Sequence, residues 1–381
     1  MKFSIKKDKL NEIIDLCLRF VSKSSTLPIL ENIYIKADED WIVFKSTDME
    51  KYMSFVVPQQ ASSYGTITVN WRLISDIIKN IDAPVVDIVM QEDSETMFLK
   101  TEEDEFTVKW IPSSEYVAIP EIEWIDNISF SAKDFDLWIS KVEYAITERN
   151  FSPVLTWMLI RLNSEESNST LSFVWTDSFR LAEYKISLDN VGKNFDLIVP
   201  KTNINEVKKI IEYYIEKWWQ DFKISFSENL VSFEFCLDDF QIYVTSVLIQ
   251  WNFPDYNNES IIPTKFATNC QIKKDDFEKA IKKVSVFTKD INHFIDLKIS
   301  NWLVDVDSGN TDKWQAQTKL SANVSWEDVS FGINWKYILD FIKQAEESEE
   351  IWLNVVDNQK PIVFSDLSDT KITYIIRPLI Q

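Results

Sequence analysis

Few side chains in this sequence could act as nucleophiles, general bases or metal ligands. There is one histidine, His293, and there are three widely separated cysteines, Cys17, Cys236 and Cys270. An activated serine or cysteine nucleophile needs a base beside it, and no such constellation surrounds His293 in the sequence. The motifs HExxH, CxxC and GxxxxGKS or GxxxxGKT, which hold zinc or nucleotide phosphates, do not occur. The sequence therefore predicts no metal site and no cofactor.

Carboxylates are the remaining candidates for catalysis. Glu102, Glu103 and Asp104 form one acidic cluster, and residues 346–350 contain another. Paired carboxylates can perform general acid and base chemistry, but both clusters have the composition of solvent-exposed hairpin tips. The sequence favours a protein that is not an enzyme, and an enzyme that uses surface carboxylates remains an alternative.

The length and composition indicate a folded, multidomain protein. The chain has 381 residues, of which 45% are hydrophobic, and this length predicts two or three domains. No run of about 18 uncharged apolar residues predicts a membrane span. The first residues are charged and do not resemble a signal peptide, and the few cysteines favour a reducing compartment. We therefore expect a soluble, cytoplasmic protein.

Three diverged repeats of about 125 residues each follow one another along the chain. Each repeat opens with a strand that leads into a helix, at 2–14, 129–140 and 270–281, and has a second such junction at 67–81, 197–211 and 331–345. Between them lie short alternating runs that predict antiparallel meanders. The predicted fold class is α+β, with two helices on antiparallel sheet in each repeat. The predicted domains are 1–124, 125–263 and 264–381, and Asn70 and Asn334 are the predicted N-caps of two helices.

Charge is distributed unevenly between the predicted helices and the rest of the chain. The net charge is −21, yet the six segments 6–21, 71–81, 133–149, 201–217, 273–289 and 335–344 together carry +6, which leaves −27 for the other residues. Helix propensity alone favours lysine in helices. The alternative interpretation is that the six helices face one anionic partner while the acidic sheets face solvent.

Glycine is rare and tryptophan is abundant. The sequence has four glycines and fifteen tryptophans, whereas average glycine usage is about 7%. Trp302 follows Asn301 where a hairpin favours Asn-Gly, and the pair Trp218-Trp219 stands where a glycine would end a helix. One hypothesis is that the gene comes from a lineage that reads UGA as glycine, so that many of these positions are glycine in the cell. The alternative is a protein that is truly rich in tryptophan.

Several segments resemble the bacterial sliding-clamp family, the β subunit of DNA polymerase III. The resemblance covers essentially the whole chain, because the segments lie in all three repeats and in the family's order. They are TLPIL at 26–30, SPVLTW at 152–157, WTDSFRLA at 175–182, WNFPDY at 251–256, SW at 325–326 with FGIN at 331–334 and YILD at 337–340, and YIIRPLI at 374–380. Trp157, Trp251 and Trp326 stand where the family has glycine, which agrees with the recoding hypothesis.

The resemblance implies the DNA-clamp fold in three copies and a head-to-tail homodimer that closes into a ring around double-stranded DNA. Such a ring must slide, so weak contacts between lysine or arginine and phosphate suit it. The residues that would face DNA are Lys23, Arg72, Arg149 and Lys201. Ser24 stands where relatives often have arginine, which puts the contact in that loop in doubt.

The resemblance also implies a pocket between the second and third domains that binds short QLxLF-like peptides of the polymerase, the clamp loader and repair proteins. An apolar pocket with a few fixed polar groups suits a peptide anchor. Its apolar part would comprise Leu155, Thr176, Leu181, Pro254, Ile375 and Leu379, with Phe179, Arg180, Asn334, Tyr337 and Pro378 around it. Arg377 replaces a usual methionine and would make one side of the pocket more polar.

For the dimer interface, we expect Phe106 and Val108 of one copy to meet Val286 and Phe287 of the other. Two such contacts close a two-fold ring. The main alternative function is a monomeric α+β adaptor that binds other proteins and does not encircle DNA.

Overall fold

The computed structural model describes residues 1–91, 95–117, 126–146, 156–189, 191–215, 221–237, 239–288, 293–300, 302–309 and 315–379. Contacts between residues divide the chain into two compact units. The first unit comprises Met1–Asp136 and Thr202–Gln250, and the second comprises Leu137–Lys201 and Trp251–Gln381. None of the described helices is long and apolar enough to cross a membrane.

The described residues form six α-helices, one in each segment for which the sequence predicts a helix. They are α1 (Lys7–Cys17), α2 (Trp71–Asn80), α3 (Ala132–Ser140), α4 (Lys201–Tyr214), α5 (Lys274–Ser285) and α6 (Trp335–Gln344). The side chain of Asn70 accepts hydrogen bonds from the N–H groups of Arg72 and Leu73, at 3.1 and 3.4 Å, and that of Asn334 accepts one from the N–H of Lys336 at 3.0 Å. Both predicted N-caps are therefore confirmed.

Helix α3 is shorter than the predicted segment 133–149. The N–H of Val142 donates to the carbonyl of Ile139, only three residues back, and a short 3-10 helix, η4 (Glu143–Ala145), follows. Val142 and Ala145 are fully buried. The tighter turn therefore redirects the chain while it keeps these two apolar side chains in the core. Residues 147–149 of the prediction lie outside the described residues.

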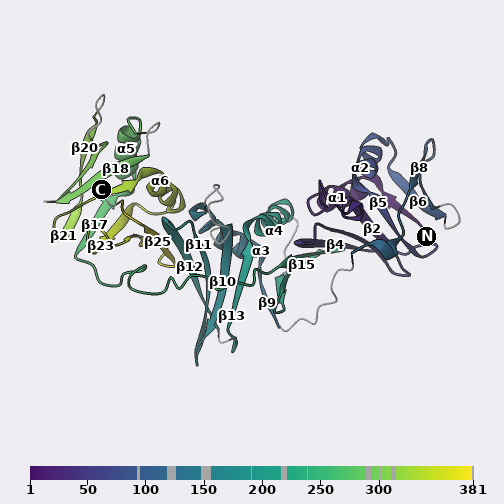
Figure 1. Cartoon of the computed structure of the whole chain (residues 1–381), viewed down its shortest axis with the longest axis horizontal. Coiled ribbons are helices and arrows are strands. Elements are labelled where there is room, and N and C mark those ends of the chain that lie inside the picture. Colours follow the sequence, from purple (N-terminus) through teal and green to yellow (C-terminus); the bar gives the residue numbers. More distant parts are fainter. Residues whose placement is uncertain are drawn as a thin grey trace. The chain divides into compact units, whose positions relative to one another are not determined.

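Two antiparallel sheets build the first unit. The four-stranded sheet has the order β1-β6-β7-β8, with β1 (Lys2–Lys6), β6 (Val85–Gln91), β7 (Thr96–Lys100) and β8 (Glu105–Lys109). The eight-stranded sheet has the order β5-β2-β3-β4-β16-β15-β14-β9, with β5 (Gly65–Asn70), β2 (Asn32–Ala37), β3 (Trp41–Thr47), β4 (Lys51–Pro58), β16 (Phe240–Val247), β15 (Leu230–Leu237), β14 (Asp221–Phe226) and β9 (Asp126–Ser131). Helices α1 and α2 lie side by side in this unit (Figure 1).

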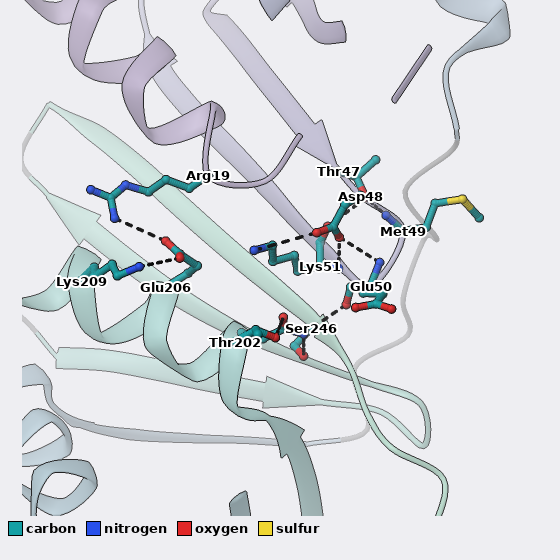
Figure 2. A network of polar contacts seen from close by, with 11 residues as sticks. Arg19, Thr47, Asp48, Met49, Glu50, Lys51, Thr202, Glu206, Lys209 and Ser246 are labelled. Atoms are coloured by element: carbon teal, nitrogen blue, oxygen red, sulfur yellow. Dashed lines mark hydrogen bonds and ion pairs between the residues drawn. The ribbon is translucent and has the colours of Figure 1, made fainter. Parts of the chain in front are cut away.

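Strands β4 and β16 join the first repeat to part of the second, and polar contacts support this pairing (Figure 2). The amide of Asn203, at the start of α4, donates to the hydroxyl of Ser246 at 2.7 Å and to the carbonyl of Glu50 at 3.4 Å. Glu206, one helical turn further on, accepts hydrogen bonds from Arg19 at 3.4 Å and from Lys209 at 2.8 Å. Asn203 is buried, so its hydrogen bonds satisfy a polar group that would otherwise be costly.

The second unit also contains two antiparallel sheets. The nine-stranded sheet has the order β13-β10-β11-β12-β25-β24-β23-β17-β21, with β13 (Phe195–Pro200), β10 (Trp157–Ser164), β11 (Asn168–Thr176), β12 (Arg180–Asp189), β25 (Ile372–Ile376), β24 (Ile362–Asp366), β23 (Glu350–Val355), β17 (Thr268–Lys273) and β21 (Asn323–Trp326). The four-stranded sheet has the order β20-β19-β18-β22, with β20 (Gln317–Ser321), β19 (Leu303–Asp307), β18 (Phe294–Ser300) and β22 (Val329–Asn334). Helices α5 and α6 pack against each other, and α5 lies beside β20 (Figure 1).

The two compact units do not coincide with the three predicted domains. Each half of the middle repeat continues a sheet of a neighbouring repeat, because β16 pairs with β4 and β12 pairs with β25. Sequence repeats and spatial contacts therefore divide the chain differently. The pairing of β12 with β25 brings segments of the second and third repeats together within one unit.

The tryptophans adopt environments that are unusual for this residue. Trp302 has a φ of +68° and is 64% exposed, in the left-handed region that favours glycine. The indole N–H groups of Trp71, Trp110, Trp175 and Trp352 are buried without a hydrogen-bond partner within the described part of the chain, although buried indoles usually find one. Trp218 and Trp219 lie outside the described residues. The recoding of these positions stays a prediction.

Candidate functional site

A pocket of about 590 Å³ opens in the second unit, between segments of the second and third repeats. Three segments line it: the turn between β11 and β12, the irregular segment that precedes β17, and the end of β25 with the turn before β24. The lining residues are Thr176, Ser178, Phe179, Arg180, Leu181, Phe253, Pro254, Tyr256, Ser260, Ile261, Gln359, Lys360, Pro361, Ile375 and Arg377.

The turn between β11 and β12 is held by its own side chains. The Asp177 carboxylate accepts hydrogen bonds from the N–H groups of Phe179 and Arg180, both at 2.9 Å. The Thr176 hydroxyl donates to the Arg180 carbonyl at 2.7 Å. Ser178, at the tip, has a φ of +72°, a conformation that short polar residues in such turns tolerate better than most. This tight turn presents Phe179 to solvent, where 57% of the residue is exposed.

Arg180 connects the pocket wall to helix α6. Its guanidinium group binds the Asp177 carboxylate at 3.1 Å and the Asp340 carboxylate at 2.6 Å, and it lies 4.2 Å from the centroid of the Tyr337 ring. Burial raises the pKa of Asp177, and the charge of Arg180 opposes that rise. A buried arginine needs such partners, because an unpaired charge in the interior is very costly. Arg180 is therefore a structural part of the wall whose charge is already matched.

Pairing of β12 with β25 supplies the opposite wall. Leu181 lies opposite Ile375, and beyond the paired strands the N–H of Arg377 donates to the carbonyl of Phe179 at 2.8 Å. Leu181 and Ile375 are 3% and 4% exposed, so they form a firm apolar floor. This contact joins residues that are almost 200 positions apart in the sequence.

The segment before β17 closes a third side. Phe253 and Tyr256 are buried, with ring centroids 6.1 Å apart in an edge-to-face arrangement. The Tyr256 hydroxyl donates to the buried Glu183 carboxylate at 2.9 Å, and burial together with that carboxylate raises the pKa of Tyr256. These anchors hold the exposed Pro254 at the rim.

The structure brings six of the eleven predicted pocket residues together: Thr176, Phe179, Arg180, Leu181, Pro254 and Ile375. Leu155 lies outside the described residues. Tyr337 does not line the pocket but lies under the guanidinium group of Arg180. The role of all these residues in peptide binding stays a prediction.

Three further predicted pocket residues do not line this pocket, and their role in peptide binding stays a prediction. The side chain of Asn334 caps α6, and Pro378 is buried. Leu379 lines a separate pocket of about 310 Å³, because its N–H donates to the Gly332 carbonyl at 2.9 Å and draws it toward β22.

Sequence reasoning missed a larger set of lining residues. Phe253 and Tyr256 belong to the WNFPDY segment, so that motif could have indicated them. Ser178 likewise belongs to the WTDSFRLA segment. The remaining missed residues are in turns or irregular segments with no periodic pattern: Ser260, Ile261, Gln359, Lys360 and Pro361.

Two of the four predicted DNA-facing residues lie together. Lys23 and Arg72 are exposed, and the guanidinium group of Arg72 donates to the Lys23 carbonyl at 3.5 Å. Lys201 is the first residue of α4 and is half-exposed. Arg149 lies outside the described residues. Ser24 is exposed beside Lys23.

The residues of the predicted dimer interface lie at or near sheet edges. β8 ends the order of one four-stranded sheet and β20 ends that of the other, within the described residues. Phe106 is half-exposed, and Val286 and Phe287 are 71% and 37% exposed. Val108 is 1% exposed within the protomer, and its part in the dimer contact stays a prediction, as does that of Phe106.

No group of three or more histidine, cysteine, aspartate or glutamate side chains suited to a metal ion occurs among the described residues.

Comparisons with known proteins agree along the whole chain. Family models of the DNA polymerase III beta subunit match residues 1–120 (N-terminal domain), 129–255 (central domain) and 259–380 (C-terminal domain). The chain is 26% identical to the beta sliding clamp of Staphylococcus epidermidis and 25% identical to that of Staphylococcus aureus, over 100% of this chain and 99% of each relative. Its fold is similar to pol III beta of Caulobacter crescentus (TM-score 0.88, 22% identity) and to the DNA polymerase III subunit beta of Pseudomonas aeruginosa (TM-score 0.86, 21% identity), each over 100% of both chains.

Proposed function

The chain belongs to the DNA polymerase III beta subunit family, and we propose that it acts as a sliding clamp, which encircles double-stranded DNA and tethers the replicative polymerase and other DNA-processing proteins. The observation that carries this proposal is the pocket formed by the β11–β12 turn, the segment before β17 and the end of β25. A clamp needs such an anchor because it has to hold its partners while it slides.

The pocket suits a short peptide with apolar side chains. Leu181 and Ile375 form its floor, and Phe179 and Pro254 stand exposed at its rim. Burial of one leucine or phenylalanine side chain contributes about 1.5–3 kcal/mol. Two such anchors offset part of the cost of immobilising a flexible peptide, so micromolar affinity is the expected range.

Contact with DNA is proposed for exposed basic residues of the helices and adjoining loops. Lys23 and Arg72 form a basic pair in the first unit, and Lys201 and Arg149 are the other candidates. Lysine and arginine attract phosphate without reading sequence, and this attraction weakens as salt rises. Contacts of that kind allow the clamp to slide along any sequence.

A ring requires two copies to join, and we propose that the β8 edge of one copy pairs with the β20 edge of the other. Phe106 would meet Val286 and Phe287, and all three side chains are at least partly exposed in the single protomer. Both edges are open in the described residues, and an open edge is a template for pairing with another chain. A head-to-tail contact repeated twice closes a two-fold ring.

The proposed role is non-catalytic and cytoplasmic, and it needs no cofactor. The alternative function is a monomeric adaptor, and light scattering distinguishes it from a dimeric clamp by the mass of the particle. The clamp predicts a particle of twice the 44.8 kDa chain mass at micromolar concentration, and Phe106→Asp should shift it toward monomer. A wild-type protein that is monomeric at this concentration would favour the adaptor.

Peptide binding tests the pocket directly. A fluorescein-labelled QLDLF peptide should bind the purified protein with micromolar affinity in a fluorescence-polarisation assay. Phe179→Ala should weaken binding by about tenfold, because it removes the exposed side chain that forms one wall of the pocket. Its contact with the peptide contributes roughly 1–2 kcal/mol to the binding free energy. Leu367→Ala, which truncates a residue that is 60% exposed and does not line the pocket, is the matched control. Equal binding by both variants would remove the pocket from the proposal.

A further inference from the structure

The charges that line the pocket are all of one sign. Among the described residues, its lining contains Arg180, Lys360 and Arg377 and no aspartate or glutamate, although the whole chain carries a net charge of −21. The charge of Arg180 is matched by Asp177 and Asp340. Within the described part of the chain, no carboxylate forms an ion pair with Lys360 or Arg377. Within the described residues, the pocket therefore holds two cations whose charge no ion pair neutralises.

The backbones of both residues are fixed while their side chains stay exposed. The N–H of Arg377 donates to the Phe179 carbonyl at 2.8 Å. The N–H groups of Gln359 and Lys360 both donate to the Asp357 carboxylate at 2.8 Å, which holds the turn before β24 in place. The two cations are thus anchored at the rim of the pocket and free to reach toward a ligand.

Three acidic residues lie near the pocket. Asp357 binds the N–H groups of Gln359 and Lys360 and does not line the pocket. Asp255 and Glu259 are in the segment that forms one side, but neither lines the pocket. Both are exposed, and the Glu259 carboxylate accepts a hydrogen bond from the Thr264 hydroxyl at 3.0 Å. The lining itself combines an apolar floor with two cations at the rim.

We propose that the pocket selects peptides that carry an acidic group beside their apolar side chains, and that Lys360 and Arg377 are the residues that determine this specificity. The proposal rests on the proposed function, since it concerns the same pocket. The apolar floor supplies most of the affinity, while the cations discriminate between ligands of equal shape. Arginine is suited to this because its guanidinium group can bind a carboxylate through two parallel hydrogen bonds.

The test compares three peptides of nearly equal shape, each competing with one labelled peptide so that the dye is constant. Acetyl-QLDLF-amide carries an aspartate, acetyl-QLNLF-amide is its neutral match, and acetyl-QLNLF with a free carboxyl end carries its charge at the terminus. At low salt, at least one anionic peptide should bind about fivefold more tightly than the neutral peptide, as two exposed ion pairs predict. High salt should reduce the preference.

The variants Arg377→Met, Lys360→Met and the double variant assign the preference to its residues. Each single change should lower the preference and the double change should abolish it. Lys371→Met is the matched control, because Lys371 is an exposed lysine at the other end of β25, about 20 Å from Arg377 along the strand. It should leave the preference unchanged.

Each outcome separates the two proposals. Equal binding of all three peptides to the wild-type protein would overturn the charge selection and leave the proposed function standing. A preference that survives in the double variant would overturn the assignment to Lys360 and Arg377. Failure of every peptide to bind would refute the peptide pocket itself and, with it, this specificity.

Discussion

Trp302 allows the backbone conformation of one turn to be tested quantitatively. It lies between β18 and β19 with a φ of +68°, and 64% of it is exposed. We compare Trp302→Gly with Trp302→Ala, because both remove the same indole and lose the same side-chain packing. Alanine retains the clash of Cβ in the left-handed region, which costs about 1–2 kcal/mol. Glycine avoids it but loses more chain entropy, about 0.5–1 kcal/mol. The glycine variant should therefore be more stable by roughly 0.5–1 kcal/mol.

Urea unfolding followed by circular dichroism measures this difference. The midpoint is compared, because a chain with two compact units need not unfold in one step. The expected gain shifts the midpoint of the glycine variant above that of the alanine variant by a few tenths of a molar.

Trp251 provides the control, since it is 66% exposed and has no positive φ. There the order should reverse, with the alanine variant more stable than the glycine variant. An alanine variant at least as stable as the glycine variant at position 302 would refute the reasoning. The predicted order would add support to the hypothesis that this position is glycine in the cell, which intact-mass measurement of the native protein decides.

Three other perturbations have expected outcomes. Asp340→Asn leaves the buried Arg180 with one carboxylate. The free energy of unfolding, measured in urea, should fall by about 2–3 kcal/mol, and fluorescence polarisation should show weaker peptide binding. Unchanged values in both assays would show that the ion pair is dispensable. Burial raises the pKa of Asp366, but hydrogen bonds, among them one from the Ser348 hydroxyl at 2.6 Å, lower it below its usual value. The stability that these hydrogen bonds supply is full above pH of about 4 and is lost as the pH falls through the lowered pKa. The loss of unfolding free energy in Ser348→Ala should therefore be larger at pH 7 than at pH 3. A loss that does not depend on pH would contradict this. Asn70→Ala removes the cap of α2 and should cost about 1 kcal/mol in urea unfolding, whereas Asn70→Asp should keep most of it.

Local patterns in the sequence were enough to locate the helices and two of their caps. The side chains of one helix face recur every three to four residues, and Asn70 and Asn334 cap through the N–H groups of the next two or three residues. Both signals depend on neighbours in the sequence, so no tertiary information is needed to read them. The turn at 176–180 also depends on near neighbours, because the Asp177 carboxylate binds residues two and three positions on, although the sequence analysis did not predict this turn. The end of α3 could not be read in this way, because burial of Val142 and Ala145 decided it.

Only the tertiary structure decided how the pocket is assembled. Leu181 meets Ile375 because β12 pairs with β25, and many alternating strands in this chain could have paired with β12 on the basis of their pattern alone. The pairing then brings Lys360 and Arg377 to one rim, while the bond between Leu379 and Gly332 takes Leu379 elsewhere. Sequence by itself determined the family, the helices and the residue types available for binding, because these depend on local spacing and on motifs. Which side chains share a surface depends on contacts between distant segments, and those form only when the sheets are complete.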